Sequence, residues 1–243
     1  MRIAVVSDIH GNLTALDAVL ADLKLTSPDM IFHGGDLADA GSSPAEVVDR
    51  VRDLGWPGVV GNTDEMLFRP EALQEFARQS SAMQLLLPKI EQMAEATRGL
   101  LGEDRLEWLA ALPRVQTAEP MALVHATPES LWHAPAPEAN DAQLESVFGP
   151  TGKPVAVYGH IHRPFVREVS GRIIANTGSV SLSYDGDRRA AYLLLDATDS
   201  GISAIHRRVE YDVDSELLAL SSRNLPHSDW IARILKSARP EMP

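Results

Sequence analysis

The chain has 243 residues, of which 44% are hydrophobic and 23% charged, and its formal net charge is -12. This length allows one large α/β domain or two small ones, each with a buried core. The acidic excess disfavours a general binder of DNA or RNA, because non-specific affinity comes from lysines and arginines that neutralise phosphates. The chain has no cysteine, which excludes disulfides and thiolate zinc sites, so any metal is held by oxygen and nitrogen atoms.

The apolar run at the N-terminus ends at Asp8 and is too short for the core of a signal peptide. No apolar segment approaches the length that a membrane-spanning helix needs. The absence of cysteine fits a reducing compartment. We therefore expect a soluble, cytoplasmic protein that does not contact a membrane.

The first sixty residues alternate between short apolar runs, typical of buried strands, and segments with helical spacing of leucine and valine. Ser43 followed by Pro44 predicts a helix start, since serine is a favoured N-cap and proline is accepted in the first helical turn. The expected strands cover residues 3–7, 30–33 and 58–60, and the expected helices cover 13–23 and 44–54. This alternation predicts parallel βαβ units.

Residues 65–112 are rich in leucine, methionine and alanine and carry no strand signal, which predicts several helices with breaks at Pro70 and Pro88. Beyond them, strands are expected over 114–118, 121–125, 155–158, 165–169, 173–175, 190–196 and 202–209, and helices over 141–148 and 214–236. We expect one domain over residues 1–243, with two packed sheets, outer helices and a helical cap inserted at about 65–112.

Short polar motifs follow five of the expected strands, where α/β sheets build their sites. They supply carboxylates, imidazoles and one amide, which suit transition metals better than calcium or magnesium. Asp8 and His10 are two apart, as are His160 and His162, and alternate residues of a strand share one face. The candidate metal ligands are Asp8, His10, Asp36, Asn62, His125, His160 and His162.

In order, the motifs D-x-H, G-G-D, G-N-x-D, H and G-H-x-H resemble those of the calcineurin-like metallophosphoesterase superfamily. The segment 176–180, with sequence NTGSV, is similar to one in the small bacterial and archaeal phosphodiesterase branch. The resemblance implies a four-layer αββα sandwich of two mixed sheets flanked by helices. It also implies metal-dependent hydrolysis of a phosphoester, in which a hydroxide that bridges two ions attacks the phosphate.

The same resemblance implies an assignment of ligands. Asp8, His10 and His162 would hold one ion, Asn62, His125 and His160 the other, and Asp36 would bridge both. The ions would be divalent transition metals, manganese first, with iron, zinc, nickel or cobalt as alternatives. Asp36, Asn62, His125 and Asp64 are the expected catalytic residues. Asn62, and Arg163 directly after His162, are expected to contact the substrate phosphate.

Two positions depart from the family pattern. Thr63 stands where the metallophosphatases usually carry the histidine that is assigned to protonating the leaving group, and Ala126 follows His125 where glycine is often found. Threonine has no useful pKa for acid catalysis near neutrality. Asp64, His33 and His133 are the candidate proton donors, and we expect a preference for diesters or activated leaving groups.

The main expectation is a phosphodiesterase for a small nucleotide-like or other diester. The alternatives are a catalytically silent scaffold of the same fold that binds a protein partner, and a phosphomonoesterase. A nuclease for polymers is disfavoured by the acidic charge and the lack of a basic stripe. The sequence leaves the physiological substrate, the native metal and the oligomeric state open.

Overall fold

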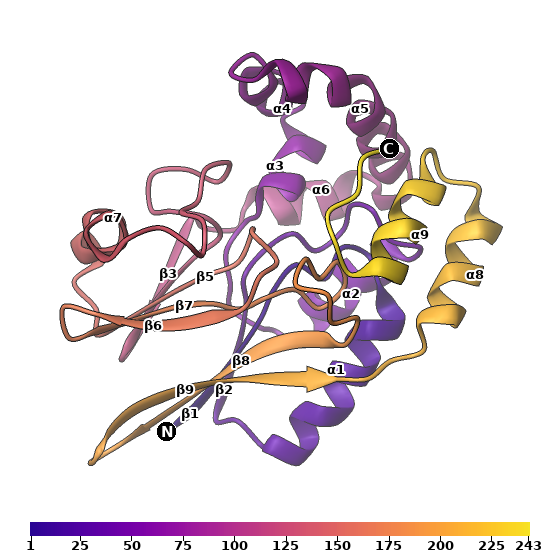
Figure 1. Ribbon diagram of the computed structural model, residues 1–243. Helices are drawn as coiled ribbons and strands as arrows, with labels where there is room; N and C mark the ends of the chain where they lie inside the picture. Colours follow the sequence, from indigo (N-terminus) through magenta and orange to yellow (C-terminus); the bar gives the residue numbers. More distant parts are fainter.

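The computed structural model describes residues 1–243 as two β-sheets that face each other, with helices outside them (Figure 1). The first sheet has the order β2-β1-β8-β9. In this sheet β1 is parallel to β2 and antiparallel to β8, and β8 is antiparallel to β9. Its strands are β1 (Arg2–Val6), β2 (Met30–His33), β8 (Ala190–Thr198) and β9 (Gly201–Val209).

The second sheet has the order β3-β4-β5-β7-β6, and β5 is parallel to both of its neighbours. Its strands are β3 (Val115–Ala118), β4 (Met121–Val124), β5 (Val155–Tyr158), β6 (Phe165–Val169) and β7 (Arg172–Asn176). The outer pairs, β3 with β4 and β6 with β7, are antiparallel. Both sheets are therefore mixed, as expected.

Successive side chains of a strand point to opposite faces of its sheet, and those on the inner faces form the central core between the two sheets. Ile3 and Val5 of β1 belong to one apolar cluster with Leu123 of β4 and Val157 of β5. The intervening residue Ala4 faces the other way and packs with helices. One face of each buried strand thus contacts the opposite sheet, and the other contacts a helical layer.

The outer layers complete the sandwich. Helices α1 (Leu13–Thr26) and α2 (Pro44–Asp53) pack on the first sheet, and α7 (Asp141–Phe148) packs on the second through Leu144 and Phe148. Asn12 caps α1, because its side chain accepts the amide hydrogen of Ala15 at 2.9 Å. The four-layer αββα architecture expected from the sequence is confirmed.

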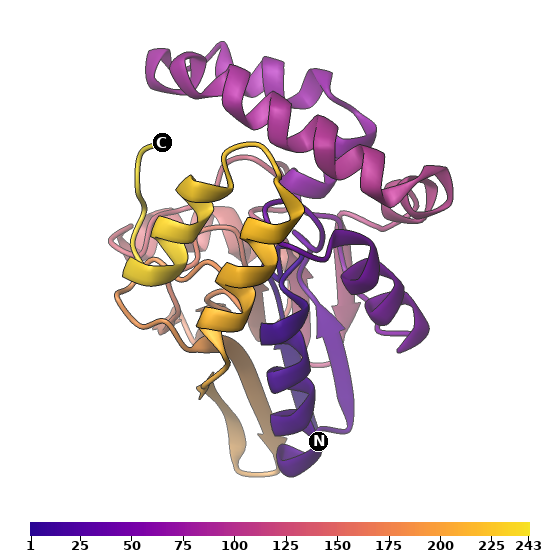
Figure 2. The same ribbon diagram turned by 90° about the vertical axis from the view of Figure 1, so that its right-hand side faces the viewer.

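The remaining helices gather beyond one end of the sandwich. Those of the expected insertion are α3 (Asn62–Phe68), α4 (Glu71–Ala77), α5 (Ser81–Leu101) and α6 (Glu103–Ala110), and the C-terminal pair is α8 (Val213–Arg223) and α9 (Ser228–Ser237). Figure 2 shows α4 and α5 at the top of the view, with the yellow C-terminal pair below them. Met93 of α5 packs with Ile231 and Ile234 of α9 in one apolar cluster. The C-terminal pair therefore contacts the insertion directly.

Two local predictions are wrong. Residues 58–60 form a single parallel bridge, between Gly58 and His33, instead of a strand, because the amide of Val60 donates to Pro113 and leaves the sheet pattern. Helix α5 continues through Pro88. The carbonyl that loses its partner there belongs to Gln84, which is exposed and open to water. None of the helices has both the length and the apolar character that crossing a bilayer requires.

Candidate metal centre

The seven candidate ligands come together at one edge of the sandwich. Asp8 and His10 follow β1, Asp36 follows β2, His125 follows β4, and His160 and His162 follow β5, while Asn62 is the first residue of α3. The four strands belong to both sheets. The site therefore spans the seam between the sheets.

The backbone at this edge is unusual. Asp8, His10, Asp36, His160 and His162 all have positive φ angles, between 50° and 68°. The two pairs spaced by one residue thus lie beyond their strands in left-handed turns, and not on a shared strand face as the sequence spacing suggested. Such a conformation costs roughly 1–3 kcal/mol per non-glycine residue. Surrounding contacts hold it, and strained residues of this kind cluster at functional sites.

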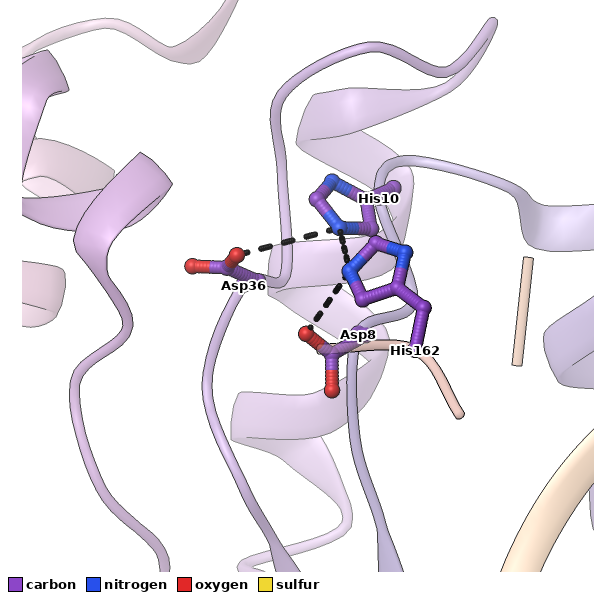
Figure 3. A group of neighbouring side chains, drawn as sticks. All are labelled: Asp8, His10, Asp36 and His162. Atoms are coloured by element: carbon purple, nitrogen blue, oxygen red, sulfur yellow. Dashed lines mark hydrogen bonds and ion pairs between the residues drawn. The ribbon is translucent and has the colours of Figure 1, made fainter. Parts of the chain in front are cut away.

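The first group of ligand atoms contains Asp8, His10, Asp36 and His162, whose side chains point toward one another (Figure 3). All four are buried, and their ligand atoms lie within 4.8 Å of one another. The Nε2 atoms of His10 and His162 are 3.2 Å apart. His162 Nε2 is 3.1 Å from Asp8 Oδ1 and His10 Nε2 is 3.7 Å from Asp36 Oδ2.

The hydrogen bonds made by Nδ1 of His10 and of His162 determine which ring nitrogen carries the hydrogen. His10 Nδ1 lies 3.0 Å from the carbonyl oxygen of Asp39, and His162 Nδ1 lies 2.6 Å from that of Leu182. Each Nδ1 therefore donates, and each neutral Nε2 presents a lone pair. Two lone pairs and two carboxylates then face one another without a hydrogen between them. This donor set fits a divalent transition-metal ion, and the carbonyl partners orient the imidazoles as in known metal sites.

The second group adjoins the first and shares Asp36. Asn62 Oδ1 is 2.9 Å from His125 Nε2 and 2.8 Å from His160 Nδ1, and His125 Nε2 is also 3.4 Å from Asp36 Oδ2. His125 Nδ1 lies 2.8 Å from the carbonyl oxygen of Gly34 and donates to it, which leaves a lone pair on Nε2. The lone pair faces two oxygen acceptors, so this group also fits a cation.

The buried charged groups of the centre shift one another's pKa values. Burial alone would lower the pKa of His125, but the Asp36 carboxylate outweighs burial and raises it to about 9. Burial raises the pKa of Asp36, and the His125 charge and hydrogen bond more than reverse this, so its pKa is lowered. Burial and the nearby His125 charge lower the pKa of His160 to about 3.

Asp64 lies behind the ligands. It is fully buried, and its carboxylate accepts the amide hydrogens of Leu37 at 2.9 Å and Gly61 at 3.1 Å. These amides neighbour Asp36 and Asn62 in the chain. Gly35 has a φ of 87°, and a side chain there would meet the Gly61 nitrogen at 2.5 Å, so glycine is required where the two loops touch.

A cavity of about 220 Å³ opens over the centre. His10, Asp36, Asn62, His160 and His162 contribute to its lining, and so does Thr63, whose buried hydroxyl has no hydrogen-bond partner within the chain. Its other walls come mainly from α3, α5, α9 and the loop after β7; they are Asp39, Ala40, Met66, Ile90, Met93, Leu182, Tyr184, Trp230, Ile231 and Ile234. An open cavity beside convergent polar groups is the usual form of a small-molecule site.

Several candidates from the sequence lie outside this cavity. Arg163 does not line it; its Nε donates to the Tyr184 carbonyl at 3.2 Å, and its Nη1 is 3.6 Å from Glu138. His33 is fully buried against Trp108 without a hydrogen-bond partner, and burial lowers its pKa to about 4. His133 lines a different cavity. His33 therefore lies apart from the cavity, whereas the roles expected of Arg163 and His133 stay predictions.

The sequence analysis did not identify the far walls of the cavity. Trp230, Ile231 and Ile234 recur at helical spacing, which predicts an apolar helix face but not its partner. Asp39 also lines the cavity, and its buried carboxylate accepts the Thr97 hydroxyl of α5 at 2.7 Å. In the sequence, only its position three residues after Asp36 indicates that Asp39 lies near the centre.

The chain is similar along nearly its whole length to several known proteins. The chain is 30% identical over 254 residues to the uncharacterized protein MJ0912 of Methanocaldococcus jannaschii, and the match covers 96% of both chains. A metallophosphoesterase structure from Sphaerobacter thermophilus is 27% identical, with a TM-score of 0.78 and coverage of 98% of this chain and 99% of that one. The hypothetical protein PH1004 from Pyrococcus horikoshii shares the fold, with 18% identity, a TM-score of 0.80 and coverage of 96% and 97%.

The sequence profile of the calcineurin-like phosphoesterase superfamily domain matches residues 1–200, which include every candidate ligand. The resemblance noted from the motifs is thereby confirmed, and the chain belongs to the calcineurin-like phosphoesterase superfamily.

Proposed function

We propose that this protein is a metal-dependent phosphodiesterase with a binuclear centre. One observation carries the proposal: two adjoining groups of lone-pair donors meet at Asp36, whose Oδ2 lies 3.7 Å from His10 Nε2 and 3.4 Å from His125 Nε2. A carboxylate in this position suits a bridge between two ions. The proposed ligands are Asp8, His10 and His162 for one ion and Asn62, His125 and His160 for the other, with manganese as the first candidate for both.

Two bound divalent ions would polarise the phosphoryl oxygens and provide a nucleophile from water at neutral pH. The chain's own residues orient this chemistry. The carbonyls of Asp39, Leu182 and Gly34 fix the imidazoles of His10, His162 and His125. Thr63 lines the cavity, and its amide donates to Asp36 Oδ1 at 2.9 Å, which orients the shared carboxylate.

The charge of the loaded centre would suit a diester better than a monoester. Two divalent ions would bring four positive charges, of which Asp8 and Asp36 cancel two and the hydroxide nucleophile a third. No lysine or arginine lines the cavity, so the remaining charge would match the single charge of a diester and not the two of a monoester. Thr63 cannot protonate a poor leaving group. We therefore propose diesters with activated leaving groups as the preferred substrates.

The test compares bis-p-nitrophenyl phosphate with p-nitrophenyl phosphate on chelator-treated protein, before and after manganese is added. Manganese-dependent turnover that favours the diester, and that falls at least a hundredfold in Asp36→Asn, is the expected result. Asp53→Asn, the same change on the exposed end of α2, should match the wild type. Equal turnover of both esters would indicate a less selective phosphoesterase. No turnover with manganese, nickel, cobalt or zinc would contradict the proposal and favour a binding scaffold.

A further inference from the structure

The cavity above the centre has two chemically distinct halves. Its floor consists of the candidate ligands and Thr63. Its walls are almost entirely apolar: Met66 comes from α3, Ile90 and Met93 from α5, and Ile231 and Ile234 from α9. A phosphate held on the floor would therefore place whatever is attached to it against a hydrocarbon surface.

Two of the three polar side chains of the walls are already hydrogen-bonded, and the third, Tyr184, is a neutral phenol that stacks on His162. The Trp230 indole N–H donates to the carbonyl of Glu241 at 2.7 Å, and the Asp39 carboxylate accepts a hydrogen bond from Thr97. The cavity lining contains no lysine or arginine. A second phosphate or a carboxylate on the substrate would lose its hydration without gaining a cationic partner, and such burial of an unpaired charge is costly. The walls therefore select against substrates with additional negative charge.

The size of the cavity restricts the substrate further. A dry apolar cavity of about 150 Å³ is sufficient for one benzene molecule. The cavity here is about 220 Å³ and must also admit the phosphate. The space between the walls thus suits one ring or a short alkyl chain beside the phosphate, and any further group of the substrate would extend through the open side of the cavity.

We propose that the substrate is a phosphodiester of which one ester group is neutral and apolar, an aryl ring or a short alkyl chain, and that this group binds between α5 and α9. This inference rests on the proposed function and names the substrate class for the same site. It replaces the nucleotide-like diester expected from the sequence with a more apolar ester. The walls that decide it come from the insertion and from the C-terminal helix, far apart in the chain.

Binding of non-hydrolysable phosphonates tests this without relying on turnover. Methylphosphonate, phenylphosphonate and phosphonoacetate share a phosphonate head and differ in the attached group. Calorimetry with manganese-loaded protein should show phenylphosphonate binding about tenfold or more tightly than methylphosphonate, since the ring buries apolar area. Phosphonoacetate, with its added carboxylate, should bind no more tightly than methylphosphonate. Equal affinities for the methyl and phenyl compounds, or no binding of either, would overturn the inference.

Variants of α5 test whether the preference for phenylphosphonate comes from the apolar wall of the cavity. Ile90 is partly buried and lines the cavity, whereas Leu85, on the same helix, is 78% exposed and does not. Ile90→Lys should remove most of the preference for phenylphosphonate and strengthen phosphonoacetate binding, and Ile90→Ala should weaken phenylphosphonate alone. Leu85→Lys should leave all three affinities unchanged. Equal responses to Ile90→Lys and Leu85→Lys would overturn the assignment.

The two proposals can fail separately. If diester turnover depends on manganese and Asp36 but the phosphonates bind equally, the phosphodiesterase proposal stands and the apolar subsite does not. If no ester is hydrolysed but phenylphosphonate binds more tightly and responds to Ile90→Lys, the subsite stands and the catalytic proposal does not.

Discussion

Asp64 offers a direct test of how the two ligand loops are held. Its oxygens accept the amide hydrogens of Leu37 and Gly61, at 2.9 and 3.1 Å, just beyond Asp36 and just before Asn62. In Asp64→Asn, one of the two amides would face an NH₂ group instead of an oxygen. Neither Asp64 nor its hydrogen bonds are exposed to water that could replace the lost partner.

The magnitude follows from these contacts. Burial and the Asp36 carboxylate raise the pKa of Asp64 to about 7, so at neutral pH the acceptor is only partly charged. The substitution removes one hydrogen bond, worth about 1–2 kcal/mol, and leaves a buried amide without a partner, which costs about 1–3 kcal/mol. With partial relaxation of the loop, we expect a loss of about 3 kcal/mol in the free energy of unfolding. For a chain of this size that corresponds to a decrease in Tm of about 6–12 °C. Because both loops carry ligands, manganese affinity should also fall by about 10–100-fold.

Urea unfolding of the metal-free protein measures the first effect, and calorimetric titration with manganese measures the second. Asp53→Asn provides the control, since an exposed position should change the free energy of unfolding by less than about 0.5 kcal/mol. An Asp64→Asn variant with wild-type stability would refute the hydrogen-bond argument. A destabilised variant with unchanged manganese affinity would refute the positioning role and leave Asp64 purely structural.

Three further predictions concern other parts of the molecule. Arg207 of β9 donates a hydrogen bond to Asp22 and holds the pKa of that carboxyl below 3.8. Asp22→Asn should therefore lower the free energy of unfolding by about 1–2 kcal/mol at pH 7. Urea unfolding should show this difference shrinking as the pH falls below 4, where Asp22 becomes protonated. A Cβ at Gly159 would lie 2.5 Å from Asp8 Oδ2, so Gly159→Ala should weaken manganese binding at least tenfold, whereas Gly99→Ala on α5, which meets nothing within 4 Å, should not. Thr63→His should raise turnover of diesters with alkyl leaving groups relative to nitrophenyl ones, by about tenfold or more; an unchanged ratio would show that a missing acid does not limit the reaction.

The sequence predicted the sandwich well because its strands are short apolar runs with turns at defined positions. The prediction failed where local signals compete with tertiary contacts. Residues 58–60 are as apolar as a strand, but Val60 bonds to Pro113 and leaves the sheet. Pro88 is a strong helix breaker, yet α5 tolerates it on an exposed face.

The sequence predicted that the candidate ligands follow strand ends at one edge of the sheets, but it predicted neither their backbone geometry nor the walls of the cavity. Strand ends place Asp8 and His10 at the correct edge, whereas their left-handed backbone depends on hydrogen bonds to the loop after β2: the Asp8 amide donates to Gly35 and the His10 amide donates to Asp36. The apolar face of α9 was visible as a pattern, but no pattern within one helix indicates which surface it covers. The proposed substrate selectivity rests on that unpredicted part.

The placement of the ligands on both sheets has a consequence for folding. His10 and His162 are 152 positions apart in the chain. Neither half of the centre exists until the strands before these ligands have paired and the two sheets have docked. Contacts this distant in the chain form late, because the loop they close carries a large entropic cost. A partly folded chain therefore presents no complete donor set, and uptake of metal should mark the completion of folding. Manganese added during refolding should accordingly slow unfolding of the finished protein without accelerating its assembly.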